Sequence, residues 1–85
     1  INNLYPNPFN STINMKLVLE DNIDEFDLNL ISLTGRIISS KTFNSKGLGE
    51  HVYKIQFNNL FSSGMYILEV KSGFQRQTRK ILYLK

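Results

Sequence analysis

Apolar and polar residues alternate with a period of two along most of this chain, and no other feature limits its fold as strongly. The alternation is clearest over residues 13–19 and recurs over residues 26–31, 51–57 and 65–71. Alternate side chains of a strand point to opposite faces of a sheet, so this period is typical of half-buried strands. No stretch of useful length has a helical period, and alanine, the best helix former, is absent. The pattern therefore predicts an all-β protein.

Turn signals separate these segments and set the expected number of strands. Clusters rich in glycine, asparagine and serine occur at residues 34–36, 44–49, 58–64 and 72–73. Turns every 8–12 residues predict an antiparallel sandwich or barrel, and strands with one wet face favour the two-layer sandwich. We expect six strands, the last over residues 75–84, and a seventh if residues 4–10 pair. Positive φ is expected at Gly35, Gly64 or both, because glycine adopts it without steric cost.

The length of 85 residues allows one small domain. Both prolines lie near the start, at Pro6 and Pro8, and proline cannot donate to a sheet ladder. We therefore predict a lead-in over residues 1–12 and a single β-sandwich over residues 13–85. The chain begins without a methionine or a leader pattern, so we expect it to be a piece of a longer protein. The core is expected to include Leu17, Leu28, Leu30, Ile55, Tyr66 and Leu68.

The composition offers little for catalysis or for binding a cofactor. Cysteine is absent and His51 is the one histidine, so a thiolate metal site, a two-histidine site and a disulfide are excluded. No nucleophile-elbow pattern occurs. We expect no catalytic residue, no cofactor and no metal. The acidic segment at residues 20–27 lacks EF-hand spacing, although sandwich loops can bind calcium, and the sequence leaves that question open.

Neither a membrane span nor a nucleic-acid site is expected. No window approaches the roughly 20 apolar residues that a membrane helix needs. Residues 51–85 carry six basic residues and one acidic residue. Basic residues spread along strands are more typical of a solvated sheet face than of a nucleic-acid interface.

Four sequence blocks follow one another along the chain: Y-P-N-P-F-N at residues 5–10, a block around Gly35 and Arg36 at residues 30–38, L-F-S-S-G-M-Y-I-L at residues 60–68, and the basic and apolar residues 79–85. Together they resemble the type A C-terminal sorting domain of the type IX secretion system of Bacteroidetes-like bacteria. The N-P-F-N segment is also similar to Ig-like modules related to the C-terminal domain of the flagellar hook-capping protein. The resemblances imply an Ig-like antiparallel β-sandwich.

The resemblance to sorting domains implies an address label on a larger secreted cargo. Such a domain follows an upstream cargo domain, folds in the periplasm, and is recognised by the outer-membrane translocon and by shuttle or sortase components. A cell-surface sortase removes many of them, and the cargo is secreted or held at the surface. The motif residues implied for recognition are Asn7, Pro8, Gly35, Arg36, Gly64, Tyr66, Lys80 and Lys85.

Physical reasoning divides these motif residues into two groups. Turn geometry accounts for the two glycines, and the core accounts for Tyr66. Arg36, Lys80 and Lys85 have less structural need, so they are the better candidates if a partner binds side chains. An exposed last strand also offers its backbone for strand addition. The alternative is an Ig-like spacer or adhesion module, with carbohydrate binding as its activity; the absence of tryptophan does not favour it.

Overall fold

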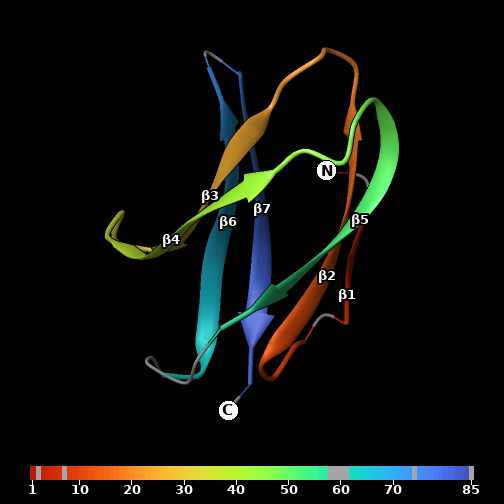
Figure 1. Cartoon of the computed structure of the whole chain (residues 1–85). Coiled ribbons are helices and arrows are strands. Elements are labelled where there is room, and N and C mark those ends of the chain that lie inside the picture. Colours follow the sequence, from red (N-terminus) through yellow and green to blue (C-terminus); the bar gives the residue numbers. More distant parts are fainter. Residues whose placement is uncertain (2, 7, 58–61, 74, 85) are drawn as a thin grey trace.

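The computed structural model describes residues 1, 3–6, 8–57, 62–73 and 75–84, and these residues form seven strands and no helix (Figure 1). The predicted all-β class is confirmed, and the lead-in supplies the seventh strand. The strands are β1 (Asn3–Tyr5), β2 (Thr12–Leu19), β3 (Glu25–Ser32), β4 (Ile37–Asn44), β5 (Gly49–Gln56), β6 (Gly64–Ser72) and β7 (Gln75–Tyr83).

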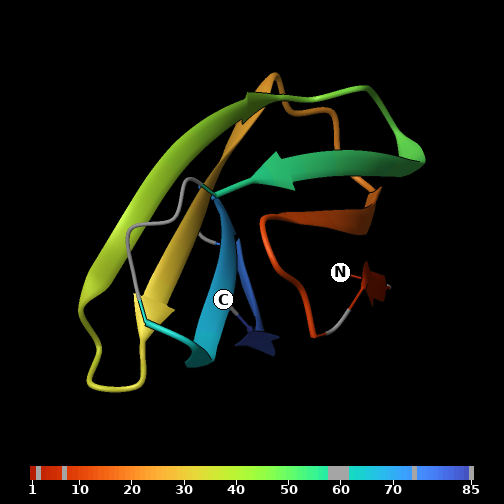
Figure 2. The same ribbon diagram turned by 90° about the horizontal axis from the view of Figure 1, so that it is seen from below.

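The strands form two antiparallel sheets that face each other (Figure 2). One sheet has the order β1-β2-β5 and the other has the order β4-β3-β6-β7. The predicted antiparallel sandwich is confirmed, and seven strands divided between two sheets are typical of Ig-like sandwiches. β1 and β7 are edge strands, as expected for a proline-containing lead-in and for a last strand open to a partner.

The core lies between the two sheets and follows the period-two pattern of the sequence. All six residues predicted for it are buried: Leu17, Leu28, Leu30, Ile55, Tyr66 and Leu68. The lead-in also contributes, because Ile1 and Phe9 belong to the same buried cluster. The residues before β2 are therefore part of the packing of the sandwich.

The connection between β3 and β4 is a tight turn that requires glycine. The Gly35 amide donates to the carbonyl oxygen of Ser32 at 2.9 Å, and the Ser32 amide donates to the carbonyl oxygen of Arg36 at 2.8 Å. Gly35 has φ of 92° and Gly64, at the start of β6, has φ of 151°. The predicted positive φ is confirmed at both glycines. A Cβ at Gly35 would meet no atom within 4 Å, so the backbone alone imposes the preference.

Replacing Gly35 with valine should destabilise the domain by about 1–3 kcal/mol, because a β-branched residue is strained at positive φ. Urea unfolding of the wild type and of Gly35→Val measures the difference. Leu33→Val, at an exposed position of the same turn, is the matched control and should unfold close to the wild type. Identical midpoints for all three proteins would contradict this role for Gly35.

Candidate functional site

The strand register brings the four sequence blocks to one end of the molecule. Tyr83 pairs with Gly64 across β7 and β6, and Tyr66 pairs with Ser32 across β6 and β3. Phe9 forms a parallel bridge with Tyr83. Figure 1 shows the start of β6 and the end of β7 at the bottom, and the turn between β3 and β4 at the left. We call this end of the molecule the motif end, and it comprises residues 8–9, 32–37, 64–66 and 81–84.

Phe9 joins the lead-in to the last strand through the backbone. Its amide donates to the carbonyl oxygen of Leu82 at 3.0 Å, and its carbonyl oxygen accepts from the Leu84 amide at 2.9 Å. The lead-in therefore covers the outer edge of β7 at its C-terminal end. Ile1 also contacts β7, through the side chains of Gln77 and Arg79.

Aromatic packing holds the same segments together inside the sandwich. The Phe9 ring lies 5.3 Å from the Tyr83 ring and 5.7 Å from the Phe57 ring, measured between centroids. The Tyr66 and Tyr83 rings are 6.5 Å apart. The Tyr66 hydroxyl donates to the carbonyl oxygen of Ser62 at 2.5 Å, which satisfies its polar end. This aromatic cluster thus includes a residue from three of the four blocks.

The solvent-facing side of the four-stranded sheet is polar toward the end opposite the motif end. There the Asn29 amide donates to Glu69 Oε1 at 2.8 Å, and the Ser40 hydroxyl donates to Asn29 Oδ1. Arg76 Nε lies 3.2 Å from Glu69 Oε2. Asn29 and Glu69 are buried although they face outward, and these partners satisfy their polar groups.

Toward the motif end the same outer face becomes apolar. Ile37 pairs with Ile31, Ile31 with Ile67, and Ile67 with Lys80, which makes one row across four strands. Met65 and Leu82 pair in the next outward-facing row. We call Ile31, Ile37, Met65, Ile67 and Leu82 the outer apolar patch. Arg36, next to Ile37 in the chain, and Lys80 stand at its border.

The motif residues predicted from the sequence fall into different environments. Arg36, Lys80 and Pro8 are exposed, whereas Tyr66 is in the core. The Arg36 amide donates to the Ser32 hydroxyl at 3.1 Å, so its backbone is fixed while its side chain faces solvent. Asn7 and Lys85 lie outside the described residues.

The outer apolar patch was missed at the level of sequence, although a signal for it exists. Leu30 and Ile31 are consecutive apolar residues in β3, and Ile67 and Leu68 are consecutive in β6. Only one residue of each pair can face the core, because side chains alternate along a strand. Two consecutive apolar residues, one pointing to each face, therefore predict that both faces of the sheet are covered at that register.

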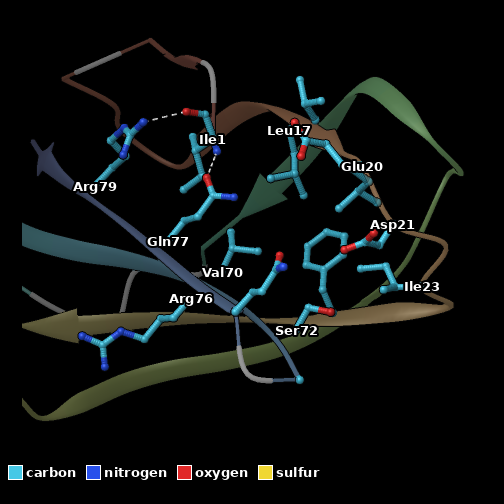
Figure 3. Close-up of a pocket in the computed structure, with 15 residues that line it drawn as sticks. Ile1, Leu17, Glu20, Asp21, Ile23, Val70, Ser72, Arg76, Gln77 and Arg79 are labelled. Atoms are coloured by element: carbon cyan, nitrogen blue, oxygen red, sulfur yellow. Dashed lines mark hydrogen bonds between the residues drawn. The ribbon is translucent and has the colours of Figure 1, made fainter.

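A groove of about 700 Å³ opens between the sheets, toward the end opposite the motif end (Figure 3). Ile1 lies in it, with its carbonyl oxygen 2.7 Å from Arg79 Nη2 and its amino group donating to Gln77 Oε1. Burial, and then the charge of Arg79, lower the pKa of that amino group. Phe26 is the aromatic residue among the described residues of the lining, and it is buried, so this described part of the groove presents no exposed ring for stacking a sugar.

The described part of the chain contains neither a candidate metal cluster nor a candidate membrane helix. No group of three or more histidine, aspartate or glutamate side chains there is placed to hold a metal ion, and this includes the acidic residues 20–27. No helix long and apolar enough to cross a membrane occurs among these residues.

Comparison with known proteins identifies a family. The model of the family described as "Secretion system C-terminal sorting domain" matches residues 3–84. No curated protein and no solved structure matches the chain.

Truncating Phe9 to alanine should cost about 3–5 kcal/mol, because it removes a buried ring that contacts Phe57 and Tyr83. Urea unfolding measures the loss. If Phe9→Ala does not fold, Phe9→Leu gives the reduced effect, on the order of 1 kcal/mol. Asn10→Ala, at an exposed neighbour, should stay within about 0.5 kcal/mol of the wild type. Equal stability of all variants would contradict the packing of the lead-in into the core.

Proposed function

The chain belongs to the family of secretion system C-terminal sorting domains, and on this premise we propose that the outer-membrane translocon of type IX secretion recognises it at the motif end. The domain is a type IX sorting signal within a larger cargo chain, and that cargo is secreted or held at the cell surface. The translocon as the partner, passage through the periplasm, and removal of the domain by a sortase are parts of the proposal.

The convergence of the four blocks is the observation that carries this proposal. Three of them are joined in one continuous sheet, and Phe9 ties the first block to the last strand. A sorting signal has to be recognised without any contribution from the residues of the cargo that it labels. A single end, built by backbone pairing and aromatic packing within the domain, meets that requirement.

We propose that Arg36 and Lys80 act in recognition and that the domain itself is not a catalyst. Both side chains are exposed at the border of the outer apolar patch, where charges can steer a partner at little structural cost. A sorting signal is a substrate of the secretion machinery, so it needs no reaction chemistry of its own. Any activity of the cargo would belong to the rest of the larger chain.

The proposal predicts that residues 1–85, fused behind a periplasm-directed reporter, carry the reporter across the outer membrane of a type IX-competent host. Immunoblots of the medium, cell surface and periplasm measure the distribution. The same fusion in a host without a functional translocon is the control and should stay in the periplasm. A reporter that remains in the periplasm of the competent host would contradict the proposal.

The role of charge needs a variant that keeps the fold. Removing residues 75–85 would also delete Ile81 and Tyr83 from the core, so its effect on export would not separate recognition from unfolding. Lys80→Ala combined with Lys85→Ala leaves those core residues in place. If charge is recognised, this variant exports less while its thermal midpoint is unchanged. Wild-type export would contradict charge recognition and favour binding through the backbone of β7.

A further inference from the structure

The outer apolar patch lies on the solvent side of its sheet, where a half-buried strand ordinarily carries polar residues. Ile37 is 58% exposed and Met65 is 40% exposed, while Ile31, Ile67 and Leu82 are half-buried. The five side chains are neighbours by register and cover four adjacent strands. Contiguous apolar surface of this kind on a small domain marks an interaction site.

We propose that the outer apolar patch is the docking surface for a protein of the type IX machinery. The part of the partner that docks would present an apolar surface bordered by carboxylates. This proposal rests on the proposed function, and it names the surface and the chemistry through which the sorting signal is bound.

The sequence blocks themselves connect the patch to sorting. Ile31 and Ile37 belong to the second block, Met65 and Ile67 to the third, and Leu82 to the fourth. Packing explains the inward-facing members of these blocks, such as Leu30, Leu68 and Ile81. It gives no reason for apolar side chains at the outward-facing positions. A bound partner supplies that reason, because it would bury them.

The shape and stiffness of the patch favour a protein over a lipid surface. Three of its five residues are isoleucines, whose β-branched side chains have few rotamers and lose little entropy on binding. They stand on a sheet face, which packs well against another ordered surface. Membrane anchoring instead uses an amphipathic helix or a cluster of four or more basic residues. Among the described residues, we place two basic side chains at the border of this patch, Arg36 and Lys80, which is fewer than such a cluster needs.

The border charges favour a partner of opposite sign over a second copy of this chain. Arg36 precedes Ile37, and Lys80 lies across from Ile67. A second copy docked on the same face would bring its own positive border to this one, which costs binding energy. Carboxylates on the partner would pair with both side chains and speed association.

A pair of substitutions tests the patch in the reporter fusion carrying residues 1–85. Ile37→Ser with Met65→Ser removes its two most exposed apolar side chains. The matched control is Leu48→Ser with Val52→Ser, which removes two side chains of comparable exposure, 53% and 37%, outside the patch. The patch pair should reduce export about tenfold or more, as expected when two interface anchors are lost. The control pair should export like the wild type.

Thermal unfolding of each purified fusion separates binding from folding, and both pairs should melt close to the wild type. If the patch pair is less stable than the control pair, Ile37→Ser alone supplies the test. Wild-type export by the patch variants, or an equal loss in both pairs, overturns the proposal. Failure of the unmodified fusion to leave the periplasm would instead refute the proposed function, so the two failures are distinguishable.

Two further measurements address the other occupants of the patch. The wild-type fusion should not sediment with vesicles of anionic phospholipid, and it should sediment as a monomer. Vesicle binding or dimerisation that is lost in the patch pair would overturn the proposal in favour of a lipid surface or a second copy, respectively.

The charge reversal Arg36→Glu tests the carboxylates that we propose at the border of the partner's surface. This variant should slow export, and export at the wild-type rate would contradict an acidic border on the partner.

Discussion

The packing of Phe9 against Phe57 and Tyr83 is the contact on which the arrangement of the motif end depends. A domain of 85 residues buries only about 60% of its unfolded surface, so each large core side chain carries a substantial part of the stability. Phe9 also makes two backbone hydrogen bonds to the last strand. Phe9 thereby holds the N-terminal lead-in against the C-terminal end of the last strand.

The sheet of β4, β3, β6 and β7 then has to serve two purposes at once. Its inner face closes the core, with Leu28, Leu30 and Leu68 completely buried. Its outer face is polar at one end, where Asn29 and Glu69 satisfy each other, and apolar at the motif end. The polar half satisfies its own hydrogen-bonding groups, and the apolar half is the surface that we propose for a partner. The turn at Gly35 joins Ile31 in β3 to Ile37 in β4, and so it bounds the apolar part of the outer face.

The sequence predicted the fold well because its strongest signal is local. Period-two alternation identifies the strands and their buried parity, and glycine marks the turns that require positive φ. The position of Phe9 against Tyr83 could not be predicted, since it depends on a contact between residues 74 positions apart. The outer apolar patch had a signal in the paired residues Leu30–Ile31 and Ile67–Leu68. Its contiguity follows only from the register of four strands.

Crosslinking in living cells tests most directly whether the secretion machinery binds the outer apolar patch, which the motif blocks form. A photoreactive amino acid is placed at Ile37, inside the outer apolar patch, or at Val52, which is exposed outside it. Both are carried in a cargo fusion during export. Irradiation should crosslink the Ile37 position, and not the Val52 position, to an outer-membrane component of the type IX system. Equal crosslinking from both positions, or crosslinking from Val52 alone, would contradict the account.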